Sequence, residues 1–307
     1  MKHSRRARRS RTQKKQLVPL LLGIALLVVT LLSIFLIFLK QPSKQQSDSK
    51  ASMVETTASS SVTTSESSEV KTEIIWEQQT EPIKLPILMY HAIHVMAPEE
   101  EANANLIVDP TTFESHLKAL QDAGYYTLSP EEAYKVLTEN VLPAGKKVVW
   151  LTFDDSLWDF YSYAYPLLKQ YQMKATNNVI TGFTEYGQAG HLTLDQIKEM
   201  QTAGLSFQGH TVNHPDLEYS SIEDQTNELT SSKTYLDSQL NQETIAIAYP
   251  GGRYSADTVA LTEQAGYKLG LTTNNGLASA SDGLLTLNRV RILPTTTAEG
   301  LLSEISY

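Results

Sequence analysis

Residues 148–155 read Val-Val-Trp-Leu-Thr-Phe-Asp-Asp, a stretch that contains both a strand and a candidate catalytic pair. The first six residues carry no charge and are rich in β-branched and aromatic side chains, which predicts a buried strand. Asp154 and Asp155 follow at its end, where two adjacent carboxylates point in different directions and can serve different roles. Because paired aspartates are also common in solvated turns and helix caps, the stretch alone does not decide between function and structure.

Eight short apolar segments alternate with amphipathic segments after Pro82, which is typical of a β/α fold. The predicted strands cover residues 85–90, 126–128, 147–153, 175–180, 205–208, 244–249, 267–272 and 285–292. The predicted helices cover residues 111–123, 160–171, 194–203, 222–240, 256–265 and 298–305. Eight strands predict a barrel, in which chemistry is expected at the carboxyl ends of the strands.

Three more predicted strands end in residues that can do chemistry. His210 and His214 follow one of them, and two histidines four apart can converge on one ion if the chain turns. His91 follows another, although a single histidine in such a place is more often a packing residue. The turn 249–252, Tyr-Pro-Gly-Gly, ends a third; its glycines let a ligand approach the backbone, but an ordinary loop fits it as well. Together, the four strand ends supply what a metal-assisted hydrolase needs.

The blocks 152–155, 209–214 and 248–252 resemble the first three motifs of the polysaccharide deacetylase family with the NodB-homology domain, carbohydrate esterase family 4. The resemblance covers residues 85–292 and implies an α/β fold, a distorted (β/α) barrel. It also implies that Asp155, His210 and His214 bind one divalent metal ion, with zinc favoured over cobalt or other divalent ions. By the same resemblance Asp154 is the general base.

The third motif implies the substrate side of the site. The backbone N–H of Gly251 is the candidate donor to the oxyanion, with Tyr249 and Pro250 beside it in the same turn. The family's usual arginine in this motif is missing, because Ala248 and Tyr249 occupy its neighbourhood.

The resemblance locates the general acid and the missing arginine elsewhere in the chain. Most members use a late histidine as the acid, but no histidine follows His214. A circularly permuted branch, typified by poly-N-acetylglucosamine deacetylases, begins with a strand ending in Tyr-His, as residues 90–91 do here, so His91 becomes the predicted acid. Arg289 or Arg291 resembles the arginine of that branch's last strand, with Arg289 favoured as the partner that keeps Asp154 ionised. The alternative for both arginines is a surface strand.

The loop after the paired aspartates departs from the family pattern. Ser156 and Leu157 replace the usual Gly-Pro, which makes the loop bulkier and predicts a narrower groove. Trp158 and Tyr161 can stack on sugar rings, although an aromatic residue one turn into a helix is more often part of the core. No role is assigned to the three histidines His94, His116 and His191.

The N-terminal part of the chain predicts a membrane anchor. Residues 1–15 hold eight Lys and Arg, and residues 17–39 carry no charge over a helical length of about 35 Å. An uncleaved signal anchor is favoured over a cleaved signal peptide, which places residues 1–16 in the cytoplasm and the rest outside the cell membrane. The Ser/Thr-rich residues 40–81 predict a disordered linker, and residues 82–307 form the deacetylase domain.

The predicted function is therefore metal-dependent removal of acetyl groups from N-acetylglucosamine in an extracellular polysaccharide, either an exopolysaccharide or peptidoglycan. An O-acetyl esterase remains an alternative, and the altered loop leaves open a catalytically silent carbohydrate-binding protein. The chain has no cysteine, which excludes disulfides and thiolate metal sites. Nucleic acid is not an expected partner, because the basic segment is short and precedes the apolar one, and no protein partner is predicted.

Overall fold

The computed structural model describes residues 74–306, so the predicted tail, the predicted anchor and residues 40–73 lie outside the described part of the chain. Within residues 74–306, no helix is long and apolar enough to cross a membrane. The predicted disordered linker is wrong at its C-terminal end. There, β1 (Trp76–Gln78) pairs antiparallel with β6 (Val141–Pro143), and Lys135 lies 5.2 Å from the centre of the Trp76 ring.

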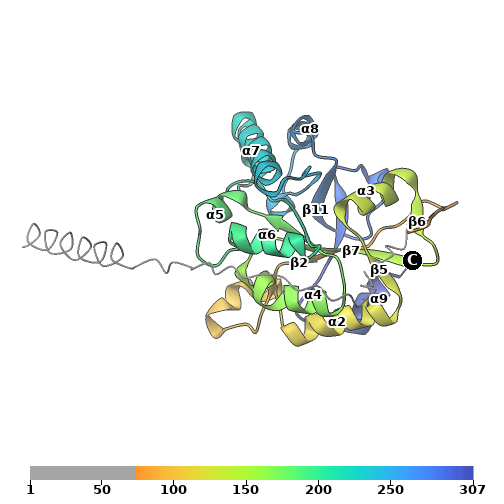
Figure 1. Ribbon diagram of the computed structural model, residues 1–307. Coiled ribbons are helices and arrows are strands. Elements are labelled where there is room, and N and C mark those ends of the chain that lie inside the picture. Colours follow the sequence, from red (N-terminus) through yellow and green to blue (C-terminus); the bar gives the residue numbers. More distant parts are fainter. Residues whose placement is uncertain (1–73, 307) are drawn as a thin grey trace, which may run out of the picture. The chain divides into compact units, whose positions relative to one another are not determined.

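Seven parallel strands form a closed ring, and each pairs with the next in the order β2 (Ile87–Tyr90), β12 (Leu287–Arg291), β11 (Leu269–Asn275), β10 (Ala246–Ala248), β9 (Ser206–Gly209), β8 (Thr176–Val179) and β7 (Lys147–Phe153). The pairing of β7 with β2 closes the ring. The first strand of the ring therefore lies beside the last, as the sequence predicted for the strand that ends at His91. Helices surround these strands (Figure 1).

The eighth predicted strand, β5 (Tyr125–Thr127), lies outside the ring. It pairs with residues 147–149 of β7, and β8 pairs with residues 152–153 further along the same strand. Because β7 is seven residues long, one of its edges has room for both neighbours while β2 takes the other edge. An eight-stranded barrel is therefore the wrong expectation, and the ring has seven strands.

The two faces of β7 contribute to two different parts of the core. Val149, Leu151 and Phe153 pack in the cluster that includes residues of helix α2 (Pro110–Asp122), whereas Val148 and Trp150 pack with residues of β2, β10, β11 and β12 inside the ring. Parallel strands covered on both faces read as continuous apolar runs, which is why residues 148–153 show no alternation. Residues of even number in β7 face the interior, and Asp154 continues that face.

Six predicted helices are present, with ends within a few residues of prediction: α2, α4 (Tyr165–Gln170) preceded by the π-helical turn η2 (Phe160–Ala164), α6 (Leu194–Thr202), α7 (Ile222–Leu240), α8 (Ala256–Gln264) and α9 (Ala298–Glu304). Two were missed: α3 (Pro130–Glu139) and α5 (Thr181–Glu185). Helix α3 has a sequence signal, since Ser129 and Glu132 form a capping box around Pro130.

The remaining elements are short segments between the strands and helices. They are β3 (Ala92–Ile93), which pairs with β4 (Ile107–Val108), and the 3-10 helices η1 (Pro98–Leu106), η3 (Leu217–Tyr219), η4 (Pro250–Gly252) and η5 (Ala280–Asp282). Strand β3 begins directly after His91, and segment η1 lies in the connection from β3 to β4.

Candidate active site

Asp154 lies inside the barrel at the carboxyl end of β7, where two side chains from other strands hold it in place. Arg289 of β12 donates from Nη1 to Asp154 Oδ1 at 2.9 Å and from Nη2 to Oδ2 at 2.7 Å. Asn178 of β8 donates to Oδ1 at 2.7 Å. The structure thus places Arg289 against the predicted base. Arg291, two residues further along the strand, instead uses its backbone N–H to reach Asn275 at 3.1 Å.

The charge state of Asp154 follows from these contacts. Burial by itself raises the pKa of a carboxyl group, and both Asp154 and Arg289 are almost completely inaccessible to solvent. The Arg289 charge and its two hydrogen bonds outweigh burial and hold the pKa of Asp154 far below its usual range. Asp154 is therefore an anion at neutral pH, and its oxygens are fixed in position.

Asp155 leaves the direction of the strand because its backbone is left-handed, with φ of +72°. A non-glycine residue rarely adopts this conformation, and it turns the second carboxylate away from the first. Asp155 Oδ1 lies 3.2 Å from Nε2 of His210 and 3.4 Å from Nε2 of His214. His214 also has a positive φ, of +59°. Two turns that cost backbone energy thus bring three predicted ligands together.

The donor set of Asp155, His210 and His214 fits a divalent metal ion. Their ligand atoms all lie within 4.8 Å of one another. His210 Nδ1 lies 2.7 Å from the carbonyl oxygen of Ala248, so this nitrogen is the donor and Nε2 of the neutral ring presents a lone pair. That lone pair faces a carboxylate oxygen, an arrangement that only a cation or a proton between the two atoms makes favourable. Two nitrogens and one oxygen are typical zinc ligands.

The pKa values in the cluster agree with this need for positive charge. Burial lowers the pKa of His210, but the hydrogen bond to Asp155 and the two nearby carboxylates outweigh it and raise the pKa above the ordinary value. Burial raises the pKa of Asp155, and the His210 contact reverses that shift. Each group is therefore stabilised in its charged form by the other.

His91 reaches the same place from β2. Its Nε2 lies 4.0 Å from Asp154 Oδ2, which is too long for a hydrogen bond, so the two groups face each other without bonding directly. Burial lowers the pKa of His91, and the neighbouring carboxylates offset this only in part. The ring is thus able to release a proton readily. The structure brings His91 together with all four residues of the other two strand ends.

The turn predicted to contact substrate is present, but only part of it is exposed to solvent. Gly251 has φ of +59° and is exposed, so its backbone is open to a ligand. Tyr249 is fully buried and its hydroxyl donates to the carbonyl oxygen of Leu285 at 3.0 Å. Pro250 is buried as well. A substrate contact in this turn is therefore a matter of its backbone, and the Tyr249 side chain belongs to the core.

Sequence reasoning missed Asn178, which lies in the predicted strand 175–180. Two adjacent asparagines, Asn177 and Asn178, occupy consecutive positions of an otherwise buried strand. Polar amides at fully buried strand positions are a signal for an internal partner, because burying an amide without one costs free energy. That signal was available in the sequence, but it does not identify the partner.

The three histidines without an assigned role have structural partners. His116 lies 3.1 Å from the Tyr90 hydroxyl and 2.8 Å from the carbonyl oxygen of Thr296. His191 lies 3.0 Å from the backbone oxygen of Asp155. His94 contacts two carboxylates at a place beside the site. Of these three, only His94 and His191 lie near the candidate metal ligands.

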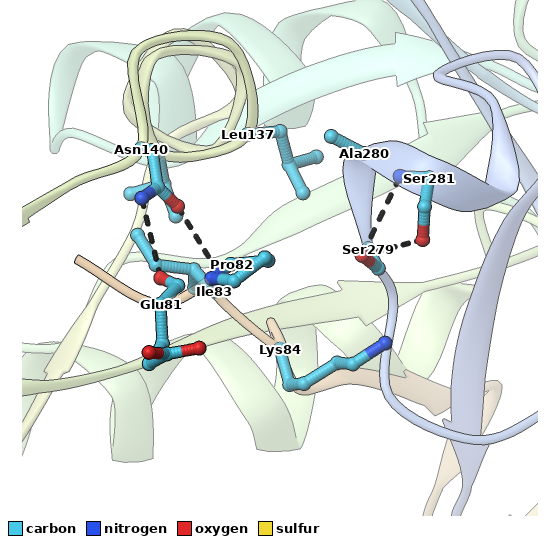
Figure 2. Close-up of a pocket in the computed structure, with 10 residues that line it drawn as sticks. Glu81, Pro82, Ile83, Lys84, Leu137, Asn140, Ser279, Ala280 and Ser281 are labelled. Atoms are coloured by element: carbon cyan, nitrogen blue, oxygen red, sulfur yellow. Dashed lines mark hydrogen bonds between the residues drawn. The ribbon is translucent and has the colours of Figure 1, made fainter. Parts of the chain in front are cut away.

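One cavity lies apart from this site. Figure 2 shows it between the chain that enters β2, the end of α3 and η5, with Asn140 binding the backbone of Ile83 and Glu81. Its volume is about 560 Å³. All three segments precede strands β2, β7 and β12, so the cavity lies at the amino ends of the strands. The candidate catalytic residues follow strands and lie at the other end of the barrel.

Comparisons with known proteins agree with this arrangement. A family described as polysaccharide deacetylase matches residues 141–270. The solved structure of the Streptococcus pyogenes deacetylase PplD in complex with acetate is 62% identical, covers 74% of this chain and 100% of its own, and has a TM-score of 0.72. YxkH of Bacillus subtilis (strain 168), whose name assigns it provisionally to the polysaccharide deacetylases, is 42% identical over 71% of this chain and 75% of its own length.

A more distant relative carries a substrate in its name. The poly-beta-1,6-N-acetyl-D-glucosamine N-deacetylase of Staphylococcus aureus (strain MSSA476) is 33% identical over 55% of this chain and 61% of its own length. The chain therefore belongs to the polysaccharide deacetylase family and is a hydrolase that acts on non-peptide carbon–nitrogen bonds.

Proposed function

We propose that the chain is a metal-dependent de-N-acetylase of an extracellular polysaccharide that contains N-acetylglucosamine. The observation that carries the proposal is the convergence of a three-residue metal ligand set, a clamped carboxylate and a partly buried histidine at one end of the barrel. Hydrolysis of an acetamide needs an activated water, a stabilised oxyanion and a proton for the leaving amine. Each requirement has a candidate group in this cluster.

Asp155, His210 and His214 are the residues that would hold the ion. A divalent ion of the zinc type, when bound, supplies Lewis acidity to the acetamide carbonyl and to water. Three protein ligands, rather than four, are the number that a catalytic site for such an ion would provide. The backbone N–H of Gly251 is the proposed second donor to the oxyanion.

Asp154 is the proposed base, and its environment restricts how it acts. Oδ1 already accepts hydrogen bonds from Asn178 and Arg289, whereas Oδ2 accepts one from Arg289 and faces His91. We therefore assign the proton transfer to Oδ2. A carboxylate whose pKa is held low is a weak base, so this step depends on a water whose acidity has been raised.

His91 is the proposed acid. Its Nε2 lies 4.0 Å from Asp154 Oδ2, so one proton can pass from the attacking water to Oδ2 while another passes from Nε2 to the amine nitrogen. Its lowered pKa favours giving that proton to an amine, which is a much stronger base. The products are acetate and a free amino sugar.

The substrate and the location of the enzyme are proposed from one relative and from the N-terminal sequence. The name of the Staphylococcus aureus relative supports an N-acetylglucosamine polymer. The basic residues 1–16 and the uncharged residues 17–39 support an uncleaved anchor with the catalytic domain outside the cell membrane. Protease treatment of intact cells tests the second point, because a domain that is cleaved only after lysis contradicts the proposed orientation.

The activity is tested with the purified full-length protein, stripped of metal and then supplied with zinc or cobalt. Release of free amine from chito-oligosaccharides or poly-N-acetylglucosamine is expected only with metal. His210→Ala should abolish both metal binding and activity. His116→Gln is a matched control, because His116 is a buried histidine outside the metal cluster. Full activity in His210→Ala, or none on either polymer with the wild type, would contradict the proposal.

A further inference from the structure

A second cavity, of about 370 Å³, is lined at one end by His91 and by the metal ligand Asp155, but His210 and His214 are not among the described residues that line it. Segment η1 and the loop after Asp155 form its walls, with the side chains of His94, Glu100, Asn103, Leu106, Leu157 and Trp158. Its volume falls within the range of about 300–1,000 Å³ that is usual for small-ligand sites. The walls mix apolar surface with hydrogen-bonding groups, as the faces and hydroxyls of a sugar ring require.

Trp158 is the main apolar surface of this cavity. Its side chain is 43% exposed, which is unusual for the largest of the side chains, yet it is held in place. The ring stacks on His94, with centroids 6.0 Å apart and planes 25° apart, and meets the Tyr163 ring edge-on at 5.9 Å. Its backbone N–H donates to Gly190 at 3.0 Å. An exposed aromatic ring fixed in this way is a preformed stacking surface.

His94 connects the two walls of the cavity. Its Nδ1 lies 2.6 Å from Oδ2 of Asp159, and its Nε2 lies 3.1 Å from both carboxylate oxygens of Glu100. Because both ring nitrogens face acceptors, the imidazolium form satisfies both contacts. Burial lowers the pKa of His94, and the hydrogen bonds to the two carboxylates outweigh it and raise the pKa. Segment η1, which carries Glu100, is thereby tied to the loop that carries Trp158.

The direction of the cavity relates it to the reaction. His91, as the proposed acid, gives its proton to the amine nitrogen, which is the atom that the sugar ring carries. The ring must therefore lie on the His91 side of the scissile bond. The cavity starts at His91, whereas His210 and His214 are not among the described residues that line it. It thus occupies the side on which the leaving amino sugar has to be.

Charge limits what the cavity can hold. Among the described residues that line it there is no lysine or arginine, and the ionisable groups are three carboxylates and three histidines. His94 in its charged form offsets only one of its two carboxylate partners, Asp159 and Glu100. An anionic sugar would meet uncompensated negative charge, and a neutral one would not.

We infer that this cavity holds the sugar ring on the amine side of the scissile bond, with Trp158 as its stacking surface and Glu100 as the group that selects uncharged sugars. The inference rests on the proposed function for the direction of the substrate, and it names two residues that determine specificity. It also separates the two substrates left open above. A neutral homopolymer of N-acetylglucosamine fits the cavity, and a strand whose neighbouring sugars carry carboxylates does not.

The test is equilibrium binding to the full-length protein kept metal-free with a chelator, so that no turnover is needed. Calorimetry measures the Kd of chitotetraose and of a tetrasaccharide in which N-acetylglucosamine alternates with glucuronate. For chitotetraose, Trp158→Ala should raise the Kd by about tenfold, the order of one lost aromatic contact, and Trp158→Phe should restore part of the affinity. Trp76→Ala is the matched control, because Trp76 lies on β1 near the amino ends of the barrel strands.

The acidic tetrasaccharide should bind the wild type at least about tenfold more weakly than chitotetraose, and Glu100→Gln should narrow that ratio. Equal Kd values for wild type, Trp158→Ala and Trp76→Ala, or equal binding of the two tetrasaccharides by the wild type, would overturn the inference. Failure of the proposed function looks different. It would appear as normal binding of chitotetraose without amine release after zinc is added.

Discussion

Replacing Arg289 with methionine is the sharpest test of how the barrel interior sustains the site. The substitution keeps an unbranched side chain but removes the guanidinium and the four hydrogen bonds it donates, two of them to Asp154 and one each to Thr272 and Thr152. Asp154 then becomes a buried carboxylate with a single remaining donor, Asn178. Breaking a buried ion pair by removing one partner costs about 3–5 kcal/mol of unfolding free energy.

The expected loss of stability is large enough to measure by thermal unfolding. Since 1 kcal/mol shifts the melting temperature of a domain of this size by roughly 2–4 °C, Arg289→Met should melt about 6–20 °C lower than the wild type at pH 7. Arg253→Met is the matched control, because Arg253 pairs with Asp216 at 2.6 Å at the solvent-exposed surface. Solvent screens that pair, so its loss should change the melting temperature little.

The effect of pH has a definite sign. In the wild type the pKa of Asp154 is lowered, so its stabilising contribution is complete above about pH 4 and is lost as the pH falls through the folded-state pKa. In Arg289→Met the main opposition to burial is gone and the pKa of Asp154 rises, so the variant regains stability as Asp154 becomes protonated. The gap in melting temperature should therefore shrink between pH 7 and about pH 5.

Two further results complete this test. The double variant Asp154→Asn, Arg289→Met leaves no buried charge and should be less destabilised than the sum of the single variants, by about 0.5–3 kcal/mol. Catalysis should fall in Arg289→Met by about 10²–10⁴, since protonated Asp154 no longer acts as a base. A melting temperature equal to that of the wild type, or a gap independent of pH, would refute the assignment of Arg289 as the buried partner of Asp154.

Three other predictions follow from the same cluster. His91→Asn should lower kcat by about 10²–10⁴ and remove the decline of activity at high pH, because burial lowers the pKa of His91 and its proton is lost first; a pH–rate profile that keeps this limb contradicts the assignment of the acid. Asn178→Ala removes one donor from Asp154 Oδ1 and should lower kcat by about tenfold with little change in KM; a change in KM alone contradicts a positioning role. Zinc affinity, measured against a chromophoric chelator, should fall by about tenfold per pH unit below the raised pKa of His210, because a proton competes with the ion; constant affinity from pH 8 to about pH 5.5 contradicts His210 as a ligand.

Much of the fold follows from local patterns in the sequence. Strand β7 and helix α7 are present with the residues predicted, because an uncharged apolar run and a long amphipathic segment each specify their own geometry. The candidate site could also be predicted from the sequence, since parallel strands place the residues at their carboxyl ends at one end of the barrel. Asp154, Asp155, His210, His214 and His91 all lie together for this reason.

Other features depend on contacts between distant parts of the chain, which no local pattern contains. Arg289 and Arg291 lie on the same face of β12 as Leu287, which packs inside the ring. Strand periodicity therefore cannot tell which of the two arginines pairs with Asp154. Only their depth in the barrel, set by the pairing of β12 with β2 and β11, brings the first of them to Asp154. The exclusion of β5 from the ring has the same origin, because it depends on the length of β7 relative to its neighbours.

The sequence by itself determined which residues stand at the strand ends, because strand periodicity and motif spacing are local properties. Only the tertiary structure decided how those residues are charged and paired. The contacts of Asn178 with Asp154 and of His94 with Asp159 join segments that are remote in sequence. Their positions are fixed by closure of the ring and by burial in a medium of low polarity, where each buried charge needs a partner.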